Sequence, residues 1–485
     1  MRTQLVRTAV LEIYEQVRRE AARADQAMQR VLRREKALRS VERRAVADAV
    51  YGLLRLQGRV DHLLERALGT RKLRMSGLAT PTQHLLRYAV YLIVGEGQGS
   101  ESAANLAGPE VAPYAWALQL VARPQELAAT ADPIDALAAE TSLPRWLAAL
   151  WAEQLGAGET RSLAAALNQR APLTVRANLL KATRDELRAA LEAEGARALP
   201  TRWSPHALTF TGRTNVFALK AFKAGLFEVQ DEGSQLIAEA CGARPGQVVV
   251  DACAGAGGKA LALAAEMRNR GKLVACDRDG RRLDELRQRA RRDGVHNWEA
   301  RAVPEGPAGE ARLDDLRGKA DVVLVDAPCS GLGALRRNPD ARWRMDQAEV
   351  DSFPPRQRDI LRRYAALVRP GGRLVYATCS INRRENEEVR ASFLAEHPDF
   401  APVPASELLG AERAAALGAR PEEVQLLPHR HGTDGFYIAA MQRRPSENGG
   451  IGASGVEAID RSTRASTPSD HGDPEWRRSP RKSRS

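Results

Sequence analysis

Three strand-like runs in the second half of the chain each end in residues that carry chemistry. They are VVVD from Val248, followed by the loop ACAGAGGK, DVVLVDAPCS from Asp321, and RLVYATCS from Arg373. Valine-rich runs separated by helical patterns are typical of buried parallel strands. Ligands of open α/β sheets bind in the crevice beyond the carboxyl ends of such strands. We therefore expect the glycine-rich loop, Cys329 and Cys379 to meet at one site, with the two thiols facing one substrate from different sides.

The 485 residues are too many for a single core, and the sequence pattern changes along the chain. Strands and helices alternate over residues 226–444, which predicts a doubly wound α/β sheet of the Rossmann-like type. Residues 1–142 have helical periodicity and predict an all-α bundle. Residues 143–225 predict a small α+β linking unit, with a strand in LTVRAN and a helix capped by Thr183 that ends at Gly195. Residues 445–485, rich in Ser, Gly, Pro and Arg, predict a disordered basic tail.

Apolar residues of the first 142 positions recur at steps of three and four, as on the buried face of a helix. The stripes are Val6, Val10, Ile13, Tyr14 and Val17; Val46, Val50, Leu53 and Leu54; and Leu85, Leu86, Ala89, Val90 and Ile93. Between the first two lies a basic stretch of Arg30, Arg33, Arg34, Lys36, Arg39, Arg43 and Arg44. A solvated helix face and a contact face for RNA phosphates explain this stretch equally well.

Composition and charge narrow the class of protein. The net charge of +12 and the isoelectric point near 9.8 favour a polyanionic partner, most simply nucleic acid, although a GC-rich genome also enriches arginine. No run approaches 18 apolar residues, and the first residues lack a signal-peptide core, so we expect no membrane span and a cytoplasmic location. The five cysteines contain no C-x-x-C spacing, which predicts reduced thiols and no metal site.

The loop after the first strand has the character of a cofactor site. Gly255, Gly257 and Gly258 allow a ligand to approach the backbone at the start of a helix. The spacing matches neither the dinucleotide fingerprint nor the phosphate-binding loop, in which a hydroxyl follows the lysine; here Ala260 follows Lys259. Asp277 ends the next strand, where an acidic residue can accept both ribose hydroxyls of a nucleoside. An adenosine-type cofactor without a pyrophosphate fits this pattern, and S-adenosylmethionine is the candidate.

These motifs closely resemble the NOL/NOP/Sun family of RNA 5-methylcytosine methyltransferases. The resemblance rests on FEVQDEGSQ from Phe227, the loop 253–259, Asp277, DAPCSGLGALRRNPDARW from Asp326, LVRPGGRLVYATCSI from Leu367 and DGFYIA from Asp434. It is strong over residues 145–444, whereas residues 1–140 resemble NusB only in helical pattern. The layout is similar to that of bacterial 16S rRNA enzymes with a NusB-like domain. It implies a class I methyltransferase fold, a monomer, and 16S rRNA as the substrate.

The resemblance also assigns roles to individual residues. Cys379 would be the nucleophile, Cys329 would help to release the product, and Asp326 would lie beside the target base and the methionine end of the cofactor. The residues implied to bind S-adenosylmethionine are Cys253, Ala254, Gly255, Ala256, Gly257, Gly258, Lys259, Asp277 and Asp326. The chain departs from the family by having Gly255-Ala256 for Ala-Pro and Ala260 for Thr. The usual acidic residue beside the adenine is not evident, since only Glu305 is acidic near Val303.

The proposed chemistry explains why two thiols and a carboxyl group are needed. Carbon 5 of cytosine is a weak nucleophile, and addition of a thiolate to carbon 6 makes it reactive. A neighbouring positive charge would favour the thiolate of Cys379. A neutral Asp326 would protonate or hydrogen-bond N3, and Cys329 would assist loss of the carbon 5 proton. The other three cysteines, Cys241, Cys276 and Cys253, are expected to be buried small hydrophobes.

The segment RRNPDARW follows the first cysteine motif. We expect Arg336, Arg337 and Arg342 to contact phosphates near the target and Trp343 to pack. Unstacking a cytosine costs a few kcal/mol, which such contacts would offset.

Three alternatives stay open from the sequence. The same chemistry could act on tRNA or 23S rRNA, because the helical domain does not identify a nucleotide. A noncatalytic RNA-binding assembly factor is disfavoured by the paired cysteines. DNA cytosine methylation is disfavoured because the DNA enzymes use the Pro-Cys cysteine as the nucleophile and lack the second one.

Overall fold

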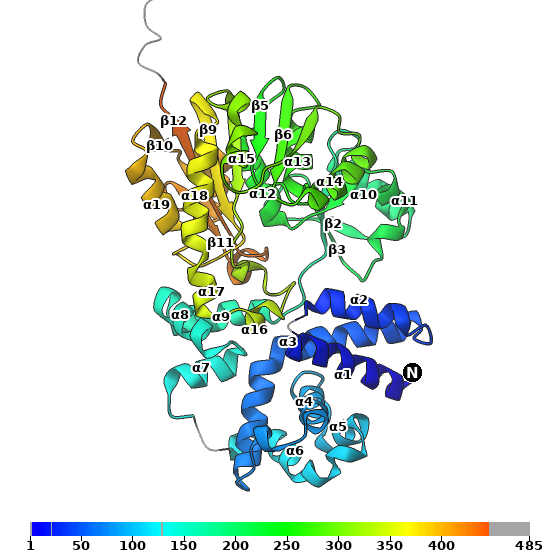
Figure 1. Cartoon of the computed structure of the whole chain (residues 1–485). Coiled ribbons are helices and arrows are strands. Elements are labelled where there is room, and N and C mark those ends of the chain that lie inside the picture. Colours follow the sequence, from blue (N-terminus) through cyan, green and yellow to red (C-terminus); the bar gives the residue numbers. More distant parts are fainter. Residues whose placement is uncertain (1, 21, 128–129, 446–485) are drawn as a thin grey trace, which may run out of the picture. The chain divides into compact units, whose positions relative to one another are not determined.

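A sheet of eight strands organises the C-terminal half of the chain (Figure 1). The computed structural model describes residues 2–20, 22–127 and 130–445. The strand order is β10-β12-β9-β8-β5-β6-β7, and β11 pairs with β12. The strands are β5 Val248–Asp251, β6 Lys272–Asp277, β7 Trp298–Ala302, β8 Ala320–Asp326, β9 Val368–Thr378, β10 Phe400–Pro402, β11 Glu423–Leu426 and β12 Phe436–Arg443. Strands β5 to β9 are parallel to one another, and the β9–β12, β12–β10 and β12–β11 pairs are antiparallel.

Helices cover both faces of this sheet, as the valine-rich strands predict. Successive strand residues point to opposite faces, so Val249 joins the core beside α12, α13 and α14, whereas Val250 joins the core beside α18 and α19. The helices of this half are α12 Glu232–Cys241, α13 Gly258–Glu266, α14 Gly280–Asp293, α15 Pro307–Ala311, α16 Ala341–Arg344, α17 Gln347–Asp351, α18 Phe353–Ala365, α19 Glu387–Glu396, α20 Ala405–Leu409, α21 Ala411–Ala416 and α22 Pro428–His431. The predicted Rossmann-like fold is confirmed.

The order of the strands brings the three motif-bearing ends together. The chain runs outward from β5 to β6 and β7, then returns to the other side of β5 with β8 and β9. A reversal of this kind leaves a crevice beyond the carboxyl ends of the central strands. The glycine loop follows β5, Cys329 follows β8, and Cys379 follows β9.

A second, antiparallel sheet lies between the helical region and this domain in the sequence. Its order is β2-β3-β1-β4, with β1 Thr174–Ala177, β2 Ala198–Pro200, β3 Ala207–Phe210 and β4 Phe227–Val229. Thr183 caps α10 Arg184–Ala193 through a reciprocal hydrogen-bond pair with Glu186, as its sequence predicts. A short helix, α11 Lys220–Lys223, precedes β4. Because Val229 pairs with Val175, the boundary expected at residue 225 falls inside this sheet and moves beyond β4.

The first third of the chain consists of helices. They are α1 Thr3–Arg19, α2 Ala24–Arg34, α3 Ser40–Gly69, α4 Thr80–Val94, α5 Ser100–Ala107, α6 Ala115–Val121 and α7 Pro133–Thr141, followed by α8 Arg145–Leu155 and α9 Ala157–Leu167. The predicted stripes form the core of this bundle, where Val10, Ile13, Val50 and Leu54 are fully buried. In the described ranges, no helix is long and apolar enough to span a membrane. The expected tail at 445–485 lies outside the described residues except for Pro445.

The basic stretch between α1 and α3 makes contacts within the bundle. Arg34 pairs with Glu12 and Glu35, and Arg43 donates hydrogen bonds to the carbonyl groups of Leu32, Glu35 and Leu38, which cap the end of α2. Arg30, Arg33 and Arg44 are exposed. An RNA contact by these exposed side chains stays a prediction.

Candidate active site

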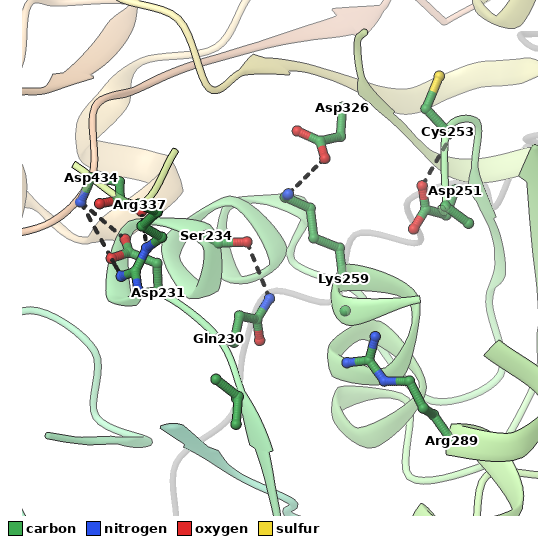
Figure 2. A pocket seen from close by; sticks show the side chains of 13 residues that line it. Gln230, Asp231, Ser234, Asp251, Cys253, Lys259, Arg289, Asp326, Arg337 and Asp434 are labelled. Atoms are coloured by element: carbon green, nitrogen blue, oxygen red, sulfur yellow. Dashed lines mark hydrogen bonds and ion pairs between the residues drawn. The ribbon is translucent and has the colours of Figure 1, made fainter. Parts of the chain in front are cut away.

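A cavity of about 310 Å³ opens at the carboxyl edge of the central strands (Figure 2). Figure 2 shows charged side chains from several elements converging on it. The lining residues are Val229, Gln230, Asp231, Ser234, Asp251, Cys253, Ala254, Gly258, Lys259, Arg289, Asp326, Arg337 and Asp434. Six of the predicted site residues therefore share one cavity with groups that the sequence did not single out: Cys253, Ala254, Gly258, Lys259, Asp326 and Arg337.

The glycine loop is shaped by two glycines with positive φ, Gly255 at +55° and Gly257, and by several hydrogen bonds. Gly257 has φ of +90°, and a Cβ atom there would lie 2.0 Å from Cδ1 of Leu286. The N–H group of Ala254 donates to the carbonyl oxygen of Cys276 at 2.8 Å, and Arg289 donates to the carbonyl oxygen of Ala256 at 2.7 Å. These contacts hold the loop against β6 and α14, where only glycine fits at position 257.

Asp277 ends β6 directly beside this loop. One of its carboxylate oxygens accepts the N–H of Gly255 at 2.9 Å, and the other accepts the N–H of Asp279 at 2.8 Å. A carboxylate oxygen can accept two hydrogen bonds, so each oxygen keeps one acceptor site for a ribose hydroxyl. Glu305 pairs with Arg278 at the surface, where its side chain is 79% exposed. Which residue serves the place of the usual acidic residue beside the adenine therefore stays open.

Asp251 is a site residue that the sequence reasoning missed. It is the last residue of β5 and only 1% exposed, and its Oδ2 atom has no hydrogen-bond partner among the residues that the structure describes. Burial, followed by the negative charge of Asp326, raises the pKa of Asp251 to about 7. The signal that could have identified Asp251 is its position, since it is the first polar residue at the carboxyl end of a valine run.

The residues around the cavity fit S-adenosylmethionine. Asp277 offers acceptors for the ribose hydroxyls, and a Cβ placed on Gly255 would have only a guanidinium nitrogen of Arg282, at 4.0 Å, as a neighbour, which leaves the loop surface open. The unpaired Oδ2 of Asp251 is an acceptor for an ammonium group such as that of the methionine moiety. When bound, the cofactor supplies an electrophilic methyl group on a cationic sulfur. No group of three or more potential metal-binding side chains occurs among the described residues.

Lys259 and Asp326 form an ion pair across the cavity (Figure 2). Nζ of Lys259 lies 2.6 Å from Oδ2 of Asp326. Burial lowers the pKa of Lys259, but Asp326, Cys379 and Asp251 outweigh this and hold that pKa above its ordinary value. Lys259 therefore keeps its charge, and it is the positive group that the sequence argument required near Cys379. The structure places the carboxyl group of Asp326 in an ion pair with the ammonium group of Lys259, and the neutral Asp326 expected from the sequence stays a prediction.

The two predicted cysteines are in direct contact. Sγ of Cys329 lies 3.2 Å from Sγ of Cys379, and the expectation that the two thiols face one substrate from different sides stays a prediction. The hydrogen bond with Cys379, together with burial, raises the pKa of Cys329 well above its ordinary value. This raised pKa favours the protonated thiol form of Cys329. Cys241 and Cys276 are buried in the core as predicted, whereas Cys253 lines the cavity.

Two of the three predicted phosphate contacts, those of Arg336 and Arg342, need correction. Arg342 is completely buried and donates to Oδ1 of Asn168 at 2.8 Å, and Arg336 is 5% exposed and pairs with Asp434. Neither side chain is accessible to a phosphate group, because each is engaged inside the protein. Arg337 pairs with Asp231 and Asp434 but also lines the cavity, so an RNA contact there stays a prediction.

Trp343 packs, as predicted. Its indole N–H donates to the carbonyl oxygen of Leu54 in α3 at 2.7 Å. Through this contact, the RRNPDARW segment packs against α3, which belongs to the first third of the chain.

Comparisons with known proteins agree with this fold and site. The family model described as 16S rRNA methyltransferase RsmB/F matches residues 239–442, and the model of the ferredoxin-like domain of RsmF/B-like methyltransferases matches residues 143–217. The chain is 31% identical over 450 residues to a probable ribosomal RNA small subunit methyltransferase B of Synechocystis sp., covering 89% of this chain and 98% of that protein. A protein described in the same words from Bacillus subtilis is 35% identical over 313 residues, covering 64% of this chain and 69% of the relative.

A solved structure also extends the likeness to nearly the whole chain. The crystal structure of PH0851 aligns with a TM-score of 0.72 and 27% identity, covering 91% of this chain and 99% of that one. The chain belongs to the RsmB/F family of S-adenosylmethionine-dependent rRNA methyltransferases.

Proposed function

We propose that this chain transfers a methyl group from S-adenosylmethionine to carbon 5 of a cytosine in 16S rRNA. The observation that carries the proposal is the contact of Cys329 with Cys379, next to the Lys259–Asp326 pair. Oxygen or nitrogen methylation requires no thiol nucleophile. A thiol pair beside a cofactor cavity suits attack on a pyrimidine ring, because carbon 5 becomes nucleophilic only after addition at carbon 6.

Cys379 is the proposed nucleophile. Its Sγ forms a bond to carbon 6 of the cytosine, and the electron pair of the ring moves toward N3. The positive charge of Lys259, which is paired with Asp326, also attracts the negative charge of the thiolate before this step. Cys329 holds the shared proton, which leaves Cys379 as the reactive sulfur.

Asp326 is placed to serve N3 of the ring. It takes up a proton from Nζ of Lys259 across their 2.6 Å contact and passes it to N3 as Cys379 attacks. After methyl transfer, Cys329 gives up its own proton to solvent and, as a thiolate, accepts the proton of carbon 5. The electron pair of that carbon–hydrogen bond forms the carbon 5–carbon 6 double bond, and the bond from carbon 6 to Cys379 breaks to return the thiolate. N3 returns its proton through Asp326 to Lys259.

The choice of 16S rRNA over other RNA rests on two supports. The matching family model is described as a 16S rRNA methyltransferase, and the similarity to the Synechocystis relative spans 89% of this chain, more than the 226–444 domain alone occupies. The cytoplasmic location and the monomeric state expected from the sequence stay predictions.

Transfer of tritiated methyl groups to naked 16S rRNA, 23S rRNA and tRNA tests the proposal. Wild type should yield 5-methylcytosine in 16S rRNA. Cys379→Ala should abolish turnover, whereas Cys329→Ala should methylate once and then stall as an adduct that survives a denaturing gel. Cys241→Ala, which removes a buried thiol of α12 outside the site, is the matched control and should turn over.

Each outcome bears on a different part of the proposal. Label in 23S rRNA or tRNA would preserve the chemistry and overturn the substrate. A Cys379→Ala protein that remains active while Cys329→Ala is dead would reverse the roles of the cysteines. The absence of label from naked RNA and from 30S assembly intermediates would favour the noncatalytic assembly factor.

A further inference from the structure

A buried carboxylate binds the residue that follows each active-site cysteine. Glu385 has no exposed surface and accepts four hydrogen bonds. Its Oε2 atom accepts the N–H of Ser330 at 2.9 Å and Nε2 of Gln357 at 3.1 Å. Its Oε1 atom accepts the hydroxyl groups of Ser330 at 2.5 Å and Ser380 at 2.6 Å. Ser330 follows Cys329 and Ser380 follows Cys379, so a single side chain joins the two cysteine loops.

Further buried contacts hold the residues that precede the cysteines. Gln357 also donates to the carbonyl oxygen of Pro328 at 3.0 Å. The hydroxyl of Thr378 donates to Oδ1 of Asn386 at 2.6 Å, and Nδ2 of Asn386 donates to the carbonyl oxygen of Ser380 at 3.0 Å. Each cysteine is therefore fixed on both sides, and Glu385 with its neighbour Asn386 connects the two fixed segments.

We propose that Glu385 is a positioning residue, which holds the two loops in register so that the sulfurs of Cys329 and Cys379 meet. The proposal rests on the proposed function, because it assumes that these sulfurs are the reacting groups. Glu385 itself bonds only to protein groups and is assigned no contact with RNA or cofactor. A buried charge is costly unless it is fully hydrogen-bonded. The four donors around Glu385 meet that condition and join loops that are 50 residues apart in the sequence.

The charge of Glu385 has a second consequence at Cys329. The hydrogen bond with Cys379 and burial are the main causes of the raised pKa of Cys329, and the charges of Cys379 and Glu385 add to them. A negative charge near a thiol disfavours the thiolate. Glu385 therefore helps Cys329 to keep the proton that Cys379 must lack, and a neutral side chain at position 385 would weaken this bias.

Two substitutions separate the charge from the hydrogen bonds. In Glu385→Gln, the amide oxygen can replace Oε2 as acceptor for Ser330 N–H and Gln357. The two serine hydroxyls can rotate to accept from the new NH₂ group. Glu385→Gln thus keeps the hydrogen bonds without the negative charge, whereas Glu385→Ala removes both. Glu388, an exposed neighbour at the start of α19, provides the matched controls Glu388→Gln and Glu388→Ala.

The first measurement is the rate at which diamide oxidises Cys329 and Cys379 to a disulfide in the full-length protein, read from the linked peptide by mass spectrometry. Two thiol hydrogens pass to the diazene, and one sulfur–sulfur bond forms. We expect Glu385→Ala to slow this reaction by about tenfold, because the loops lose a buried hydrogen-bonded junction, and Glu385→Gln to react nearly as fast as wild type. Equal rates for Glu385→Ala and Glu388→Ala would overturn the positioning role.

The second measurement is alkylation of Cys329 by iodoacetamide as a function of pH. In Glu385→Gln the midpoint for Cys329 should fall to lower pH, whereas Glu388→Gln should match wild type. An unchanged midpoint would overturn the inference that the charge of Glu385 helps to raise the pKa of Cys329. If Glu385→Ala does not fold, this titration and the diamide rate of Glu385→Gln decide the proposal. Neither assay uses RNA or cofactor, so a failure of the proposed methylation is distinguishable from a failure of this inference.

Discussion

Replacing Asp251 by asparagine should make the protein more stable and the cofactor weaker in binding. The carboxyl of Asp251 is 1% exposed, lacks a partner on Oδ2, and has a pKa raised from 3.8 to about 7. A raised pKa in the folded state means that the proton favours folding. The stability that this proton contributes is present below about pH 4 and is lost as the pH rises through about 7. Asparagine avoids that loss because it carries no charge at any pH.

The magnitude follows from the shift of about three pKa units, which corresponds to roughly 4 kcal/mol of unfolding free energy above pH 7. An unpaired buried amide in the variant costs about 1–3 kcal/mol and reduces the gain. A net gain of about 1–3 kcal/mol is left, and each kcal/mol raises the melting temperature of a domain of this size by about 2–4 °C. Loss of an acceptor for a charged donor should weaken S-adenosylmethionine binding by roughly tenfold or more.

Thermal melting at several pH values tests the predicted gain in stability, and calorimetric titration of the cofactor tests the predicted loss of affinity. The difference between Asp251→Asn and wild type should be close to zero or negative near pH 4 and should rise toward about pH 8. Asp284→Asn, on the exposed surface of α14, is the control and should show no such trend. If the difference in melting temperature between Asp251→Asn and wild type is the same at both ends of the pH range, the buried charge of Asp251 does not destabilise the fold. Unchanged cofactor affinity would refute its role as an acceptor.

Three further substitutions test other parts of the site. Gly257→Ala should destabilise the protein by about 1–3 kcal/mol in chemical denaturation, because its Cβ would overlap Cδ1 of Leu286 and its φ is +90°. Lys259→Met should lower the rate of methyl transfer by about tenfold to a hundredfold in single-turnover assays, because Asp326 loses its ammonium partner, with melting temperature as the check on folding. Arg342→Met should leave the salt dependence of RNA binding in filter assays unchanged, since a side chain with no exposed surface releases no counterions; a smaller salt slope would restore the phosphate contact.

The sheet and the meeting of the cysteines were predictable because they depend on local pattern and on one topological rule. The runs that end in Asp251, Asp326 and Thr378 are dense in valine and leucine and are bounded by loops, so they form adjacent parallel strands. Once the strands are adjacent, residues that follow their carboxyl ends must be neighbours. The capped helix after Thr183 was predictable for the same local reason, because its cap and its partner are three residues apart.

Features that depend on distant partners were not predictable. β4 is only three residues long, and its membership of the small sheet comes from pairing with β1 about fifty residues earlier. Arg342 has the sequence surroundings of a surface arginine, yet its partners are Asn168 and the carbonyl group of Ser142. Asp251 and Glu385 carry no motif that separates a buried acid from an exposed one. Their burial is decided by how the helices cover the sheet.

The buried acids of the site are of two kinds, those with free hydrogen-bond acceptor positions and those without. Asp251 and Asp277 lie on the cofactor side, where Asp277 keeps free acceptor positions and Asp251 has one wholly unpaired oxygen. Glu385 binds the residues that follow the two cysteines, and both of its carboxylate oxygens already accept hydrogen bonds from protein groups. A carboxylate with free acceptor positions can accept hydrogen bonds from a ligand. A carboxylate whose acceptor positions are filled by protein groups instead holds those groups in place. Substituting the first kind should change affinity more than geometry, and substituting the second should change geometry more than affinity. Asp251→Asn and Glu385→Ala can be compared directly on that basis.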